Sequence, residues 1–257
     1  MEVPHTLIEK TGPLATITLN RPHKANALSV AMRASLEERL KDVAVDETID
    51  VVLIQAEGQS FCGGLDLQDL PDNPSSWRER VLAAQMNHLA VVHSPKVVIA
   101  AVQGAVVGGG ASLALSADIL VMSTDAKFSF PFLRLGIIPD GGSSYFLQAK
   151  LGVPIALDLL LTAGTLGAEE AARLGLTRRV VPASELRTSA AALAQELARL
   201  PREARMLTKS LCRRFWAPGL EDYLAHEADA FAFSASTPGH RTAMQHVKRA
   251  SSRKGAP

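Results

Sequence analysis

The sequence is poor in cysteine. Its 257 residues include only two cysteines, Cys62 and Cys212. Two cysteines this far apart cannot build the disulfide framework of a small secreted domain, and they lack the close spacing of a metal site. We therefore expect no metal centre and a protein that works in a reducing compartment.

Strong charge and long apolar runs are missing as well. The formal net charge is +1, which gives no basic surface field for nucleic acid. No apolar stretch approaches the length of a membrane span, and the first residues, MEVPHTLIEKTG, lack the basic and then apolar segments of a signal peptide. We expect a cytoplasmic protein whose partners are neither nucleic acids nor membranes.

The rest of the composition is typical of a globular protein, with 47% hydrophobic and 21% charged residues. Strand-like and helix-like segments alternate along the chain, which predicts an α/β fold with a mainly parallel sheet. The expected strands are residues 6–9, 15–19, 50–56, 97–102 and 119–122. The expected helices are residues 29–43, 77–93, 111–115, 143–151, 190–200, 204–215, 220–233 and 239–250.

Two glycine-rich loops follow two of these strands. After the strand at 97–102 come Gly104 and the run Gly108-Gly109-Gly110, and then a good helix-forming segment. This arrangement leaves unpaired N–H groups at a helix N-terminus, where an anion or a developing oxyanion is stabilised. A single such loop is better explained by a tight turn that only packs a helix on a strand. Another loop, Phe61-Cys62-Gly63-Gly64-Leu65-Asp66-Leu67, follows the strand at 50–56 and favours the functional interpretation. In chain order, 61–67 is the first loop and 104–110 is the second.

These loops resemble those of a known family. FCGGLDL at 61–67 and GAVVGGGASLALSAD at 104–118 are similar to the two loops of the crotonase (enoyl-CoA hydratase/isomerase) superfamily. Similar motifs occur at 20–28, 135–142 and, more loosely, 159–176, so that the resemblance covers roughly residues 10–210. It implies a spiral of ββα turns that forms the core at 1–195, with the acyl-thioester site. It also implies a C-terminal helical region at 196–257 that assembles homotrimers or hexamers.

The resemblance also implies which residues form the site. In this family two backbone N–H groups bind the thioester oxygen, and here they fall on Leu65 and Gly109. The coenzyme A part of the substrate falls on two segments, Lys24, Ala25 and Ala27 in one and Gly63, Gly64, Asp66 and Leu67 in the other. From the sequence alone, Lys24 is better explained as a solvated surface lysine, and Asp66 as a residue that hydrogen-bonds loop or helix-start amides. Beyond the thioester substrate itself, no cofactor is implied.

One departure from the family pattern decides the expected reaction. Hydratases of this family carry two glutamates at the positions of Ser112 and Phe132, and neither residue here can transfer a proton. One carboxylate remains nearby, Asp140 in the segment IPDGGS. Asp140 either caps the helix at 143–151 or acts as the acid/base, as an aspartate of this turn does in dienoyl-CoA isomerases and phenylacetyl-CoA-pathway isomerases.

The apolar side chains near Asp140 predict that its pKa is raised if they enclose it. These are Phe130, Phe132, Leu133, Ile137 and Ile138. Three residues, Ser112, Phe132 and Pro139, are expected to line the substrate pocket. Cys62 is expected to be a small buried hydrophobe, His88 to be structural, and Tyr145 to line the pocket or pack between helices.

The sequence therefore predicts an enoyl isomerase that shifts a double bond in an acyl-CoA or acyl-carrier thioester through an enolate. An atypical hydratase, a decarboxylase and a thioesterase on the same scaffold are the alternative enzymes. A non-catalytic thioester-binding protein is the alternative of another class, and the two glycine-rich loops count against it.

Overall fold

A large sheet forms the centre of the molecule in the computed structural model, which describes residues 3–70 and 76–254. Its strand order is β1-β2-β3-β4-β6-β9, and every pair is parallel except the hairpin of β1 and β2. The strands are β1 (Thr6–Thr11), β2 (Leu14–Leu19), β3 (Val51–Ala56), β4 (Val97–Val102), β6 (Ile119–Ser123) and β9 (Val180–Val181). β3 and β4 are apolar almost throughout because both faces of the sheet are covered.

A second, smaller sheet was not predicted. It consists of β5 (Ala105–Val107), β7 (Lys127–Ser129) and β8 (Thr165–Gly167) in the order β5-β7-β8. Strands of three residues are too short to show an alternating pattern in the sequence. With β5 and β7 in place, the chain contains the successions β4-β5-α3 (Gly109–Ser116) and β6-β7-α4 (Ser143–Leu151). The predicted spiral of ββα turns is therefore confirmed.

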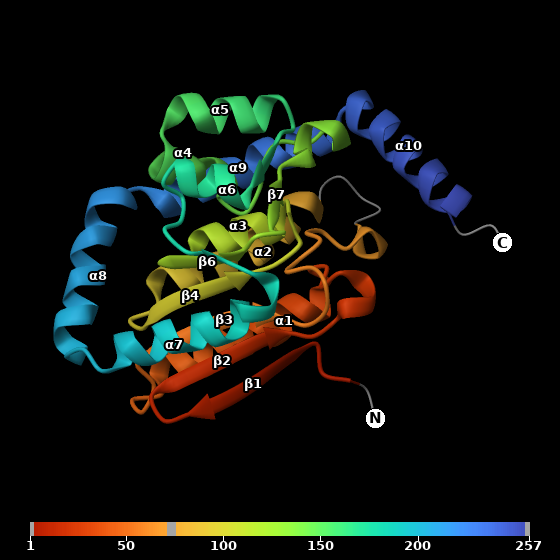
Figure 1. Cartoon of the computed structure of the whole chain (residues 1–257). Coiled ribbons are helices and arrows are strands. Elements are labelled where there is room, and N and C mark those ends of the chain that lie inside the picture. The colour runs from red at the N-terminus through yellow and green to blue at the C-terminus, as the bar shows by residue number, and fades with distance from the viewer. Residues whose placement is uncertain (1–2, 71–75, 255–257) are drawn as a thin grey trace.

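Helices cover both faces of the large sheet. α1 (Val30–Val45) and α2 (Ser76–His93) lie on the face that also carries the small sheet, whereas α7 (Leu186–Ala198) lies on the other face, mainly against β3, β4 and β6 (Figure 1). The hydroxyl of Ser29 caps α1 by accepting the N–H of Met32, as the sequence predicted. Two short helices, α5 (Val153–Leu161) and α6 (Ala168–Arg173), complete the core.

The C-terminal helices are α8 (Arg202–Trp216), α9 (Leu220–Ser236) and α10 (Pro238–Lys254). Each begins directly after a proline or glycine or at one, which is where the sequence placed the breaks. α9 packs into the body against α2, while α8 stands at its side and buries none of its residues (Figure 1). The predicted division at 195/196 falls inside α7, and residues 255–257 of the predicted helical region lie outside the described residues. Within the described ranges, no helix combines the length and apolarity needed to cross a membrane.

Candidate active site

The two glycine-rich loops meet beside one cavity. The N–H of Leu28 donates to the carbonyl of Gly64 at 2.7 Å, and Cys62 forms a β-bridge with Val106 of the second loop. Gly64 has a φ of +83°, and a Cβ on it would lie 2.6 Å from the carbonyl oxygen of Val107. Only glycine allows this approach, so the contact between the loops explains the residue type.

Leu65 and Gly109 both line a cavity of about 170 Å³. Neither backbone N–H donates a hydrogen bond to any acceptor in the described part of the chain. The amide of Gly109 is free because α3 begins at Gly109, and the first N–H groups of a helix have no partner within it. The expectation that this helix begins at Ala111 was therefore wrong by half a turn. Two free donors at one cavity are what an oxyanion needs.

Asp140 lies against the second loop. Its Oδ1 is 3.9 Å from the position that a Cβ on Gly109 would take, and this oxygen is buried without a hydrogen-bond partner in the described residues. The N-cap of α4 is Gly142, and no side chain caps this helix. The alternative that the Asp140 carboxylate caps α4 is therefore wrong. It is the main-chain carbonyl of Asp140 that accepts the N–H and hydroxyl of Ser143, at 3.2 and 3.0 Å.

Burial raises the pKa of Asp140 to about 6, although the positive charges of Arg33 and Arg80 favour its ionised form. Phe132 and Ile137 line the cavity beside it, as expected, whereas Leu133 is 40% exposed and does not enclose the carboxyl. A carboxylate that titrates near neutrality is suited to take up and return a proton.

Glu227 supports the turn that carries Asp140, and the sequence analysis missed it. This buried side chain of α9 accepts the N–H of Gly142 with both oxygens, at 3.1 Å each, and the amide of Gln85 at 3.0 Å. Burial and the nearby charge of Asp140 raise the pKa of Glu227 to about 8. A charged residue on the apolar face of a helix, between Leu224 and Phe231, was the signal that could have revealed it.

α2 turns one face towards the same cavity. Ala84 and His88 line it, and burial lowers the pKa of His88 to about 4, so that the ring is neutral. Its Nε2 lies 3.2 Å from the carbonyl oxygen of Gly109 and its Nδ1 3.1 Å from that of Ala84. A neutral ring donates to only one of these. The structural role expected for His88 is thus combined with a place in the cavity wall.

Of the predicted site residues, the structure brings seven together at the cavity: Gly63, Gly64, Leu65, Leu67, Gly109, Phe132 and Asp140. Ser112 and Pro139 do not line it, which corrects the expected pocket. Ser112 is fully buried, and its hydroxyl donates to the main-chain carbonyl of Asp140 at 2.8 Å. It lies one turn inside α3 and therefore faces the Asp140 turn instead of the cavity.

The segment predicted to bind coenzyme A lies next to the first loop but outside the cavity wall. The N–H of Gly63 donates to the carbonyl of Ala25 at 2.7 Å, and Lys24 is exposed. The guanidinium of Arg21 donates a hydrogen bond to the main-chain carbonyl of Ala27 and also forms an ion pair with Asp66 at 2.9 Å. The Asp66 carboxylate also accepts the N–H of Gln68, so the structural role expected for this residue is confirmed.

Two other candidates are resolved by their surroundings. Cys62 is buried and burial raises the pKa of its thiol to about 12, so that it is no nucleophile. The Tyr145 hydroxyl donates to the carbonyls of Trp216 and Pro218, both at 3.0 Å, which is the helix-packing role.

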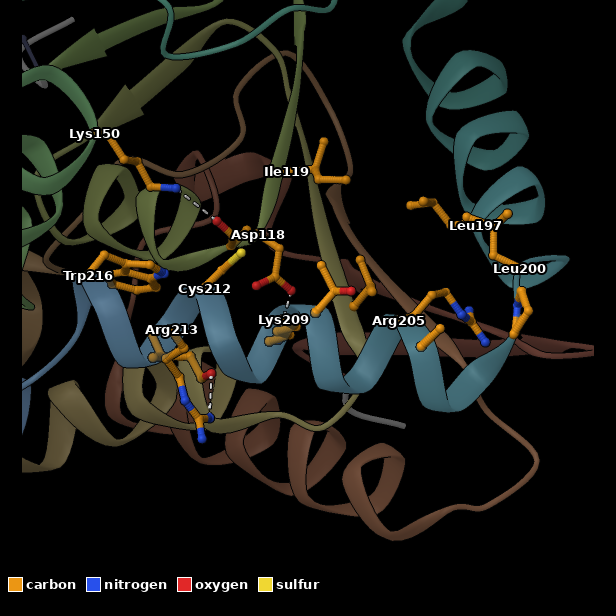
Figure 2. A pocket seen from close by; sticks show the side chains of 16 residues that line it. Asp118, Ile119, Lys150, Leu197, Leu200, Arg205, Lys209, Cys212, Arg213 and Trp216 are labelled. Atoms are coloured by element: carbon orange, nitrogen blue, oxygen red, sulfur yellow. Dashed lines mark hydrogen bonds and ion pairs between the residues drawn. The ribbon is translucent and has the colours of Figure 1, made fainter.

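A second cavity, of about 530 Å³, lies under α8 and shares no residue with the first. Lys150, Lys209 and Asp118 all line it, and Figure 2 shows both lysine side chains reaching towards the segment at Asp118. Lys209 pairs with Asp118 at 2.7 Å, and Lys150 donates to the carbonyl of Ala117 at 3.2 Å. Because Lys209 belongs to α8, its ion pair joins this helix to the segment that precedes β6.

Comparison with known proteins agrees with this geometry. Residues 9–250 match the family model described as enoyl-CoA hydratase/isomerase. A probable enoyl-CoA hydratase of Mycobacterium tuberculosis is 32% identical over 93% of this chain and 92% of its own length. The 1,2-epoxyphenylacetyl-CoA isomerase of Escherichia coli is 38% identical over 72% of this chain and 73% of its own. The crystal structure of an enoyl-CoA hydratase from Bacillus halodurans superposes with a TM-score of 0.88 at 26% identity, covering 94% of this chain and 99% of that one. The chain therefore belongs to the enoyl-CoA hydratase/isomerase, or crotonase, family.

Proposed function

We propose that this protein is an enoyl-CoA isomerase, which moves a double bond of an acyl-CoA or carrier-bound acyl thioester. The observation that carries the proposal is Asp140, the carboxylate that lines the cavity together with the two free N–H groups of Leu65 and Gly109. A 1,3-proton shift needs one group that can both accept and return a proton, and a pKa near 6 suits this double task.

The reaction begins with the thioester oxygen held by Leu65 and Gly109. Asp140 removes a proton from the α-carbon of a 3-enoyl thioester, and the electron pair of that bond moves towards the thioester oxygen as a dienolate. The dienolate then collapses, the double bond forms between the α- and β-carbons, and protonated Asp140 returns the proton to the γ-carbon. Each backbone donor contributes roughly 3–4 kcal/mol to the stability of the charged oxygen.

Hydration is the second candidate, because relatives of this chain are named enoyl-CoA hydratases. Adding water requires one group to activate the water and another to protonate the α-carbon. The positions of the two family glutamates hold Ser112, whose hydroxyl is bound to a carbonyl, and Phe132. This counts against a standard hydratase and leaves Asp140 as the only carboxylate among the described residues that line the cavity.

The test is mass spectrometry of matched 2-enoyl and 3-enoyl thioesters, on coenzyme A and on a carrier protein, incubated with the enzyme in heavy water. We expect deuterium to enter at the α- and γ-carbons with no gain in mass from water. Added water identifies a hydratase, loss of carbon dioxide from a carboxylated substrate identifies a decarboxylase, and free thiol identifies a thioesterase. If there is neither exchange nor interconversion of the 2-enoyl and 3-enoyl isomers, which chromatography separates, catalysis is rejected and the binding protein is favoured.

We also infer that the protein forms homotrimers or hexamers through α8. Leu207, Leu211 and Phe215 lie on one face of this helix with 64%, 67% and 90% of their surface exposed. A stripe of this kind is typical of a helix that packs against another subunit. Sedimentation should give a trimer or hexamer, and Phe215→Glu should shift it towards smaller species. A monomeric wild-type protein at micromolar concentration contradicts the inference.

A further inference from the structure

A buried arginine lies in the wall of the acyl cavity. Arg33 of α1 lines it together with Leu65, Gly109 and Asp140 and is only 7% exposed. Its Nη1 donates to the carbonyl of Leu28 at 2.8 Å. Neither its Nε nor its Nη2 has a hydrogen-bond partner in the described ranges, and no carboxylate there forms an ion pair with this side chain. Burying a charge that has no ion-pair partner costs free energy. An apolar acyl chain in the cavity would not offset this cost, whereas a polar or charged group of the ligand would.

A second guanidinium reinforces the positive charge. Arg80 lies on α2, one turn before Ala84, which lines the cavity. Its Nη1 donates to the carbonyl of Asp69, whereas its Nε and Nη2 are buried with no partner among the described residues. The charge of Arg80 also contributes to lowering the pKa of Arg33, after burial. Two like charges held near each other without a paired carboxylate favour an anion between or beside them.

Three carboxylates attract both arginines but none of them is that anion. Asp69, then Asp140 and Asp66, act on Arg33 and Arg80 electrostatically, yet none forms an ion pair with either arginine in the described part of the chain, and Oδ1 of Asp140 has no hydrogen-bond partner there. The cavity wall therefore presents unused N–H donors of Arg33 together with the carboxyl group of Asp140. A ligand carboxylate at Arg33 satisfies the donors with the planar geometry that guanidinium groups match best.

We propose that the acyl group carries a second carboxylate, which Arg33 binds, so that the substrate is the monothioester of an unsaturated dicarboxylic acid. This inference rests on the proposed function for the reaction but concerns binding. Arg33 places the distal carboxylate in the cavity, Arg80 adds to the local positive charge, and the thioester end remains at Leu65 and Gly109. The acyl chain then spans the space in front of Asp140, which fixes the carbon from which the proton is taken.

Calorimetric titration with two saturated thioesters tests the proposal without turnover. Glutaryl-CoA and valeryl-CoA have acyl chains of equal length and differ in the distal carboxylate. We expect glutaryl-CoA to bind at least about tenfold more tightly, as one charge-assisted bidentate contact provides. Arg33→Met should abolish this preference and Arg33→Lys should retain part of it. Arg39→Met is the matched control, because Arg39 lies on α1 but does not line the cavity.

Other outcomes overturn the proposal. Equal affinity of the wild-type protein for the two ligands does so directly, whether or not the Arg33 variants fold. If Arg33 only tunes the ionisation of Asp140, Arg33→Met changes the affinity for both ligands equally, and the proposal is wrong. A preference for glutaryl-CoA in a protein that shows no isomerisation overturns the proposed function and leaves the carboxylate site standing.

Discussion

Glu227 holds the backbone N–H of Gly142 between its two carboxylate oxygens, at 3.1 Å from each. This contact joins α9 to the turn that carries Asp140, although the two segments are far apart in the sequence. Because burial keeps Glu227 protonated up to a pKa of about 8, its charge is absent while Asp140 ionises near pH 6. In the proposed mechanism the two acids therefore have separate tasks: Asp140 would transfer the proton, and Glu227 positions the turn.

Glu227→Gln should keep this contact, because the amide oxygen also accepts the Gly142 N–H. We expect kcat within a few-fold of wild type at pH 7 and a changed pH profile. In the wild type, ionised Glu227 opposes the negative enolate, so kcat/KM should fall above about pH 8, and in the variant this fall should disappear. Glu227→Ala leaves the N–H unpaired and should lower kcat by about tenfold or more. An unchanged pH profile in Glu227→Gln contradicts the effect assigned to the Glu227 charge, and an unchanged kcat in a folded Glu227→Ala variant rejects the positioning role. Asp229→Asn on the same helix is the control.

Asp140→Asn tests the acid/base directly. The hydrogen bonds of this turn use the main-chain carbonyl of Asp140, so the fold should survive, and a thermal melt can verify this. Isomerisation of a 3-enoyl thioester should fall by roughly two to four decades. Asp158→Asn, at an exposed position of α5, should leave the rate unchanged. Full activity in a folded Asp140→Asn variant would sink the single-carboxylate mechanism.

The raised pKa of Asp140 also links stability to pH. The group is protonated in both states at low pH, and between about pH 4 and pH 6 the unfolded chain releases its proton first. The free energy of unfolding therefore decreases as the pH rises through this window, by up to about 3 kcal/mol for a shift from 3.8 to about 6. Asp140→Asn has no carboxyl group at this position and does not show this loss. The free energy of unfolding of the variant minus that of the wild type should therefore be larger at pH 8 than at pH 4. Urea denaturation at the two pH values measures the difference, and an equal difference at both contradicts the raised pKa.

Gly109→Pro isolates the second oxyanion donor. Gly109 is the first residue of α3, where proline fits because the helix has no use for that N–H. Gly108, the residue before it, has φ +50° and ψ −120°, outside the extended region that a following proline favours, so a thermal melt has to verify the fold. In the folded variant kcat should fall by roughly two to three decades. Gly109→Ala is the control, since its Cβ would meet Leu28 Cδ1 at an ordinary 3.5 Å and the N–H is kept. Equal losses in both variants would show that space around Leu28, rather than the donor, is responsible.

Local sequence determined much of this protein. The strands β2 to β4, the Ser29 cap of α1, both glycine-rich loops and the breaks between the C-terminal helices follow from short patterns, because apolar alternation, capping and glycine geometry act over a few residues. The family motifs in the same segments led to the oxyanion pair and to Asp140, and both lie at one cavity.

Only the tertiary structure decided which side chains face that cavity. Ser112 and Pro139 are close to the site in sequence yet do not line the cavity, whereas Arg33 comes to the cavity wall from α1 and Glu227 to the Asp140 turn from α9. The raised pKa of Asp140 likewise depends on burial by distant segments, and only the structure shows that its carboxylate does not cap α4. Burial and the charges around a buried group depend on residues that are distant in the sequence and meet only in the folded chain. A local sequence pattern does not identify those residues.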